Sequence, residues 1–490
     1  MKKLISIVLL LVICLSCFSC MNETTTDTNT DTGSGTSSDT SKDTGSTSKP
    51  QYTPDYSKDN NSYRPTTSSG GTIINFLNER LTYPTITKYL NGKEAALSMT
   101  FDDANNPNAG VIISETFAKY GNMKGTIMAT VSFMKESAGG EEQSLNAWRN
   151  VFDMGYLDLG CHGYYHQEPT TLPSDQYYTE IGAAVEYLRE KFPDQKVLTY
   201  ATPNAHINDA YEEYLRQYCI ANRLEAGGNF AVVGEDFNML RVKSAMISDG
   251  TNLLNIYNAL ETNVEAGRWA VHLFHDIIED DASSGWNPTK RTKFEGYCKY
   301  LNENYGDRVW FGSFEEVALY ASQYNYITID YTAASRNSMT FKVDCSLEDE
   351  ETYNMPVGMS VQLPRFVTSA YAVINGTDVQ KLEIKKENNT CKTVVKNVPI
   401  HDTEVKIYFA GNQNFRNGCV HSYEFFEFEE PNEHNYVAEV FKCKKCECTY
   451  IKSYTESKSE EGTTDSDELI PDGTLSSDED TPPNDEETTQ

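Results

Sequence analysis

Three short segments carry residue types that bind metal ions and move protons. Two carboxylates, Asp102 and Asp103, follow one apolar run; two histidines, His162 and His166, follow a second; and His275 follows a third. Histidines four residues apart can point the same way on one helical turn. A carboxylate from another strand end would complete a three-ligand metal site with room for water, which is typical of catalytic sites.

Such a set would supply the groups needed to hydrolyse an amide. A bound divalent ion lowers the pKa of its water towards neutrality and polarises a carbonyl oxygen. A second carboxylate can take the proton from that water, and a more distant histidine can protonate the leaving amine. Each group alone is common in proteins, so it is their joint occurrence after predicted strands that indicates a function.

The elements that must position these residues alternate between strand and helix over residues 73–325. This alternation favours a parallel sheet or a (β/α) barrel, in which chemistry sits at the C-terminal ends of the strands. The expected strands are 95–101, 124–131, 157–161, 196–201 and 269–274, and the expected helices are 109–120, 145–154, 177–191, 209–218 and 314–323.

The order of these motifs resembles the polysaccharide deacetylase family, also called the NodB-homology domain or carbohydrate esterase family four. The resemblance covers residues 90–325 and implies a distorted (β/α) barrel with a divalent metal, usually zinc. Carried over to this sequence, it makes Asp102 the catalytic base and His275 the general acid. It makes Asp103, His162 and His166 the metal ligands.

The resemblance also implies substrate-binding positions. Residues 200–204 resemble the third motif of the family, in which the turn at Pro203 lines the substrate groove. The backbone N–H of Asn204 would then stabilise the oxyanion. Leu273 would line the acetyl pocket.

Two departures from the family pattern concern the support of the metal site. Gly163 follows the first histidine where Ser or Thr is usual, and we expect it to loosen the metal loop. The third motif often carries an arginine that holds the base aspartate, but Ala201 and Thr202 stand there instead. The base is therefore expected to lack its arginine.

A third departure concerns the fourth motif, whose Asp-Trp pair is not visible. Arg241 is the best positional match for it. The partner that tunes His275 is open between Asp276 and Asp236.

The N-terminus indicates export. Residues 1–20 begin with two lysines, continue with an apolar run too short to span a bilayer, and end at Cys20. This resembles a bacterial lipoprotein signal, with Cys20 as the lipidated residue; Cys17 or a plain cleaved signal are the alternatives. Residues 21–72, rich in Thr and Ser, predict a disordered tether.

The C-terminal part predicts three further segments. Residues 326–412 alternate apolar and polar positions between turn signals spaced about ten residues apart, which favours an all-β sandwich. Residues 413–455 predict a small Cys/His-containing module, and residues 456–490, with thirteen acids and one base, predict a disordered acidic tail. A structural zinc site or a disulfide could use the residues Cys419, His421, Cys443 and Cys446.

The net charge of −31 excludes nucleic acid as a favoured partner, because phosphate binding needs a clustered basic surface. The sequence thus predicts a metal-dependent hydrolase of carbon–nitrogen bonds that removes N-acetyl groups from amino sugars of a cell-envelope or extracellular polysaccharide. We expect a monomer held to the membrane by its lipid anchor. The alternatives are a catalytically impaired glycan-binding lipoprotein and an amide hydrolase acting on a substrate that is not a sugar.

Overall fold

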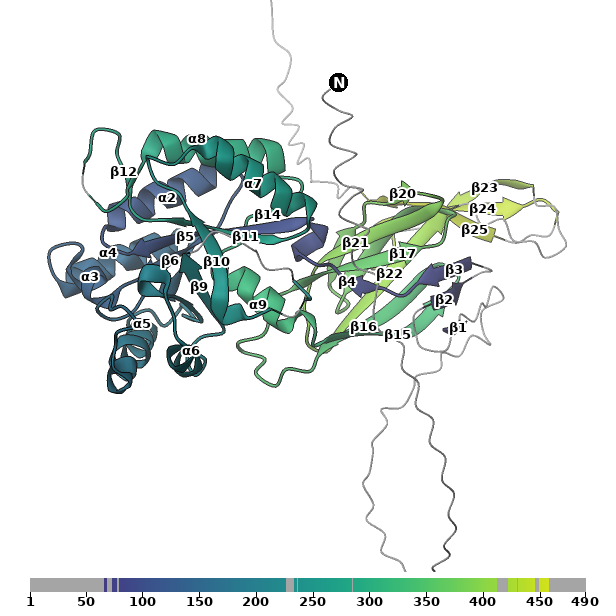
Figure 1. The fold of residues 1–490 in the computed structure, drawn as a ribbon. Helices are drawn as coiled ribbons and strands as arrows, with labels where there is room; N and C mark the ends of the chain where they lie inside the picture. Colours follow the sequence, from purple (N-terminus) through teal and green to yellow (C-terminus); the bar gives the residue numbers. More distant parts are fainter. Residues whose placement is uncertain are drawn as a thin grey trace, which may run out of the picture. The chain divides into compact units, whose positions relative to one another are not determined.

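The computed structural model describes residues 66–67, 73–76, 79–225, 233–235, 237–283, 285–411, 422–429, 431–445 and 449–457. These residues all belong to one compact unit, residues 52–490 (Figure 1). No helix within these ranges is long and apolar enough to cross a membrane. The signal expected from the sequence lies outside the described residues, as do the tether apart from Thr66–Thr67 and the acidic tail apart from residues 456–457.

A closed barrel of parallel strands forms the first part of the fold. Strand β5 pairs with β6 on one side and with β11 on the other, and the remaining strands close the circle in chain order. A short strand, β14 (Val309–Trp310), also pairs parallel with the first two residues of β5. The barrel strands are β5 (Ala95–Asp103), β6 (Gly125–Ala129), β7 (Leu157–Cys161), β8 (Thr199–Ala201), β9 (Ala221–Glu225), β10 (Val242–Met246) and β11 (Trp269–Phe274).

Helices lie around these strands (Figure 1), which confirms the predicted distorted (β/α) barrel. They are α2 (Pro107–Lys119), α3 (Val131–Glu136), α4 (Glu141–Asp153), α5 (Ala183–Lys191), α6 (Asp209–Leu215), α7 (Leu253–Glu265), α8 (Arg291–Tyr305) and α9 (Phe314–Tyr324). Shorter helical turns are η1 (Leu90–Gly92), η2 (Ser174–Gln176), η4 (Pro203–Ala205), η5 (Met239–Arg241) and the π-helical η3 (Tyr178–Gly182).

Sequence patterns found β5, β6 and β11, the barrel strands in which buried apolar residues predominate. All of β5 except its last residue is buried, because helices cover one side of a parallel barrel and side chains fill the other. The same holds for β6 and β11, so their runs of apolar residues were readable. Strands β9 and β10 were missed because polar residues interrupt them; β9 reads Ala-Asn-Arg-Leu-Glu.

The second part of the fold is all-β, as predicted. Two antiparallel sheets contribute buried side chains to one core, among them Phe341, Met359 and Ile407. One sheet has the order β15 (Ile327–Ser335), β16 (Ser338–Cys345), β22 (Thr403–Gly411), β18 (Val367–Ile374), β19 (Asp378–Lys381). The other has the order β20 (Lys385–Glu387), β21 (Thr390–Val398), β17 (Val357–Leu363), β4 (Thr85–Ile86).

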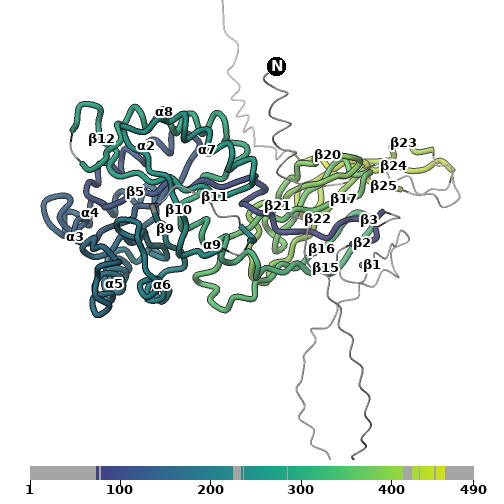
Figure 2. The backbone as a smooth tube through the Cα atoms, viewed as in Figure 1, coloured from purple at the N-terminus to yellow at the C-terminus, as the bar shows by residue number. Residues whose placement is uncertain are grey.

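The strand β4 is an early part of the chain that joins the later β-domain (residues 327–411). It pairs antiparallel with β17 before the chain enters the barrel at β5 (Figure 2). The preceding hairpin also contacts that domain, since the rings of Phe76 and Phe409 lie 5.5 Å apart. Residues 73–86 fall in the segment expected for the barrel, yet their contacts are with the β-domain.

The other strands form small sheets. These are β1 (Thr66–Thr67), β2 (Ile73–Phe76) and β3 (Glu79–Thr82); β12 (Ile277–Ile278) and β13 (Thr289–Lys290); and β23 (Tyr423–Phe428), β24 (Tyr436–Cys443) and β25 (Thr449–Glu456).

Candidate active site

A pocket of ≈ 370 Å³ opens at the C-terminal ends of the barrel strands, where the sequence placed the chemistry. It brings together residues from strands β5, β9 and β11 and from the loops that follow β6, β7, β8 and β11. Its lining residues are Asp102, Asp103, Phe133, His162, His166, Thr202, Asn204, Ala205, Arg223, Leu273, His275 and Trp286.

The strand register explains how the first aspartates and histidines meet. In the parallel pairing, Asp103 lies beside Ala129 of β6, and Ala129 lies beside Cys161 of β7. His162 follows Cys161 directly, and its backbone N–H donates to Ala129 O at 2.8 Å. Two strand ends at the same edge of the barrel therefore place Asp103 and His162 side by side.

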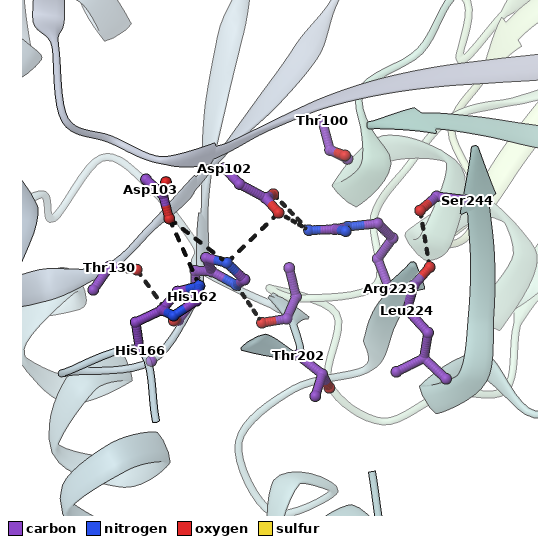
Figure 3. Close-up of polar contacts among 12 residues, drawn as sticks. Thr100, Asp102, Asp103, Thr130, His162, His166, Thr202, Arg223, Leu224 and Ser244 are labelled. Atoms are coloured by element: carbon purple, nitrogen blue, oxygen red, sulfur yellow. Dashed lines mark hydrogen bonds and ion pairs between the residues drawn. The ribbon is translucent and has the colours of Figure 1, made fainter. Parts of the chain in front are cut away.

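Asp103, His162 and His166 converge as the sequence predicted. One ligand atom from each lies within 4.8 Å of the other two. Asp103 Oδ1 is 3.9 Å from His162 Nε2 and 3.8 Å from His166 Nε2 (Figure 3). Zinc ligands lie about 2–2.2 Å from the ion, so small inward movements of these three side chains would let them hold one divalent metal.

The chemistry of His162 also fits a metal ligand. Its Nδ1 donates to Ala201 O at 2.7 Å, which leaves Nε2 pointing towards the pocket. Burial lowers the pKa of His162 more than the charge of Asp102 raises it. The neutral imidazole is the form that binds a metal ion.

Backbone strain marks the other two ligands. Asp103 and His166 have φ values of 78° and 59°, in the left-handed region that non-glycine residues seldom adopt. Residues held in such conformations cluster at functional sites, because the surrounding structure must maintain them.

Asp102 is held by an arginine, so the prediction that the base lacks one is wrong. Arg223 Nη2 donates to both carboxylate oxygens of Asp102 at 2.5 Å, and both side chains are buried (Figure 3). The arginine comes from β9, one strand beyond the third motif, and not from the motif itself. Its signal in the sequence was a charged residue inside a short strand, which needs an opposite charge if it is buried.

The charges around Asp102 keep it ionised. Burial raises its pKa, but opposing effects led by the positive charge of Arg223 outweigh burial, so the pKa lies below its ordinary value. An ionised carboxylate can accept a proton, which is the property required of the predicted base.

His275 lies in the pocket, and of the two partners proposed for it only Asp276 is among the described residues. Its Nδ1 is buried without a hydrogen-bond partner among the described residues. Burial and the charge of Asp103 raise the pKa of Asp276, while Asp236 lies outside the described residues. The indole of Trp286 packs edge-on against the His275 ring, 4.6 Å between centroids.

Of the three substrate-binding positions implied by the family resemblance, two line the pocket and one does not. Leu273 and Asn204 line the pocket, and Asn204 takes a left-handed φ of 57° in the turn η4. Pro203 begins that turn but is buried beneath it and does not line the pocket. Arg241 is not part of the site, because it pairs with Glu212 and Asp209 elsewhere on the surface.

The Cys/His set of the C-terminal module lies almost wholly outside the described residues. Of its four members only Cys443 is described, and it is buried at the end of β24. Cys419, His421 and Cys446, like Cys17 and Cys20 at the N-terminus, are outside the described ranges.

Solved structures of known proteins resemble the chain over part of its length. The chain resembles a family 4 carbohydrate esterase from Streptomyces lividans, solved with acetate, at 14% identity and a TM-score of 0.32 over 44% of this chain and 92% of that one. It also resembles a family 4 pseudoenzyme from Bacillus anthracis at 16% identity and a TM-score of 0.31, over 46% and 65% of the two chains. Likenesses at this level say nothing about activity.

Among curated proteins, none matches the chain. Residues 90–221, which hold both aspartates and both histidines of the candidate metal site, match the family model described as polysaccharide deacetylase.

Proposed function

We propose that this protein is a metal-dependent hydrolase that removes N-acetyl groups from amino sugars of a cell-envelope or extracellular polysaccharide. One observation carries the proposal: the convergence of Asp103, His162 and His166 beside the buried Asp102–Arg223 pair, in an open pocket. Two histidines and one carboxylate are a common ligand set of catalytic zinc, which makes zinc our choice of metal.

The residues of the pocket would divide the work as follows. A divalent ion held by Asp103, His162 and His166 would supply a water that is acidic near neutral pH and would polarise the acetyl carbonyl. Asp102, held ionised by Arg223, would take the proton from that water. His275 would protonate the leaving amine, Leu273 would contact the acetyl methyl group, and the backbone N–H of Asn204 would donate to the oxyanion.

Aromatic side chains at the rim favour a sugar as the substrate. The indole of Trp286 is 61% exposed beside His275, and the ring of Phe133 is 37% exposed and stacks on His166, 6.1 Å between centroids. Apolar ring faces flanking a few polar groups are typical of sites that orient small organic ligands. A sugar ring could pack on either face while its acetyl group reaches the metal ligands.

The test is acetate release from acetylated chito-oligosaccharides and from peptidoglycan, with and without a chelator. We expect the chelator to abolish release and added zinc to restore it. Asp102→Asn should lower turnover by about 10²–10⁴-fold while zinc stays bound, because the proton acceptor is lost and all three metal ligands remain. His162→Ala should lose zinc and turnover together, measured by metal content and acetate release.

The rival function is glycan binding without turnover. The Nδ1 of His275 favours it, because this atom has no hydrogen-bond partner among the described residues, whereas a general acid usually has a group that orients its ring. Zinc-loaded protein that binds these glycans but releases no acetate from any of them would establish the rival and overturn the hydrolase. Full turnover in Asp102→Asn would overturn the role given to that residue.

We also propose that the protein is exported and anchored by a lipid on Cys20, with residues 21–72 as the tether. The support is the signal-like pattern of residues 1–20. Expressed in a bacterium, the chain should incorporate labelled palmitate and sediment with membranes, and Cys20→Ala should lose both. Unchanged labelling in that variant, with loss in Cys17→Ala, would move the anchor to Cys17.

A further inference from the structure

Glu180 is a buried carboxylate behind the metal-ligand loop, and the proposed chemistry does not use it. It lies in the π-helical turn η3 and is only 1% exposed. Its Oε2 accepts the backbone N–H of Tyr165 at 3.0 Å, and its Oε1 accepts the backbone N–H of Gln167 at 2.9 Å. These two N–H groups flank His166, so one carboxylate holds the backbone on both sides of a metal ligand.

The same residue holds the loop at a third point. The backbone carbonyl of Glu180 accepts the N–H of Tyr164 at 3.1 Å. From the opposite side, the N–H groups of Val131 and Ser132 donate to the carbonyls of Gly163 and Tyr164 at 3.0 and 2.9 Å. The loop is therefore held by hydrogen bonds from two elements, Glu180 in η3 and the start of α3.

Gly163 provides the space that this carboxylate occupies. A Cβ atom at position 163 would lie 2.2 Å from Glu180 Oε1 and 3.2 Å from Tyr200 Oη. The φ of Gly163 is 88°, which a side chain would also disfavour. Gly163 was expected to loosen the loop. Instead, its lack of a side chain leaves room for the Glu180 carboxylate that holds the loop.

We infer that Glu180 is a positioning residue for the metal site, acting through the backbone of the His162–His166 loop, and that Gly163 and Glu180 work as a complementary pair. The inference rests on the proposed function only in that the loop binds a metal ion. Hydrogen bonds on both sides of His166, to the carboxylate oxygens of Glu180, can hold the backbone of His166 in its strained conformation.

The first experiment measures zinc affinity of the full chain by competition with a chromophoric chelator. Glu180→Gln keeps the size of the side chain but replaces one carboxylate oxygen by an NH₂ group. That group is a donor and would face the backbone N–H of Tyr165 or Gln167, which it cannot accept. We expect zinc affinity to fall by about 10–100-fold, the range found when groups that orient metal ligands are lost. Unfolding of the zinc-free protein is measured in parallel, so that a loss of affinity is separated from a loss of stability.

The matched control is Glu186→Gln, one helical segment further on. Glu186 accepts from Tyr178 Oη at 2.9 Å and has no contact with the loop. We expect its zinc affinity to stay within about twofold of wild type, because nothing near the ligands changes. A folded Glu180→Gln protein with wild-type zinc affinity would overturn the inference.

A second set of variants decides the matter if Glu180→Gln does not fold. Gly163→Ala should displace the Glu180 carboxylate and weaken zinc binding. In a Glu180→Ala background the new methyl group no longer meets that carboxylate, so the additional loss of zinc affinity caused by Gly163→Ala should be smaller. Wild-type affinity in Gly163→Ala, or strict additivity of the two changes, would overturn the pairing. Zinc binding without acetate release would overturn the proposed function alone, whereas absence of zinc binding by the wild type would overturn both.

Discussion

Two buried acids at opposite ends of the barrel, Asp102 and Glu315, have pKa values shifted in opposite directions. At the C-terminal end, Asp102 faces Arg223, and its pKa lies below the ordinary value despite burial. At the N-terminal end, Asp158 of β7 and Glu315 in the first turn of α9 lie close together; Glu315 Oε2 accepts the N–H of Leu198, just before β8. Burial raises the pKa of Glu315 to about 7, and burial with the charge of Glu315 raises that of Asp158 well above its usual range.

The difference teaches that the partner, and not burial, decides the charge of an acid in this barrel. Burial disfavours the ionised form at both ends, and only a facing cation reverses it. Asp102, at the C-terminal end, therefore stays ionised. Glu315 and Asp158, at the N-terminal end, hold their protons to a higher pH than ordinary carboxyl groups do. The following two predictions test this contrast, the larger effect first.

Arg223→Leu removes the cation from the C-terminal end. It leaves Asp102 buried and unpaired, so we expect a loss of about 3–5 kcal/mol in the free energy of unfolding, together with loss of acetate release. Urea denaturation measures the first effect and the acetate assay the second. The double variant Arg223→Leu/Asp102→Leu should regain much of the stability but no activity, because no charge is then left unpaired.

Arg241→Leu serves as the matched control. This arginine also pairs with a carboxylate, but it is 40% exposed, so its loss should cost less than about 1 kcal/mol. Equal losses of stability in the two arginine variants would break the contrast between a buried and a surface pair.

Glu315→Gln neutralises the N-terminal end. Because the folded-state pKa is raised, Glu315 favours folding fully below its unfolded value of about 4.5, and this contribution is lost as the pH rises through about 7. The variant should flatten the fall of stability over that window and be more stable than wild type at pH 8, by about 1–3 kcal/mol. Thermal unfolding at several pH values measures it.

Glu316→Gln is the control at the neighbouring position. Glu316 pairs with Lys124 at 2.9 Å and completes the capping box of α9 with Ser313, so its neutralisation should destabilise slightly at neutral pH. If Glu315→Gln also destabilised the protein at pH 8, the raised pKa assigned to Glu315 would be wrong.

The parts of the site that were predictable lie close to each other in sequence or directly after apolar strands. Strands β7 and β11 were predicted with their observed bounds, and Asp102, Asp103, His162, His166 and His275 all reach the pocket. The all-β domain was predictable for the same reason, because alternation of apolar and polar residues is a local signal. The break between β19 and β20 was not foreseen, since residues 381–386 read as one strand.

The sequence by itself determined the residue types at the ends of the barrel strands, and with them the candidate ligands Asp103, His162 and His166. Only the tertiary structure decided what supports them. Arg223 meets Asp102 across 121 positions of sequence, and Glu180 fits the space left by Gly163 across a turn of irregular helix. Such contacts depend on the closure of the barrel and on the register of strands that are polar in sequence. Local patterns do not encode either of these, because each side chain must be compared with neighbours that only folding brings together.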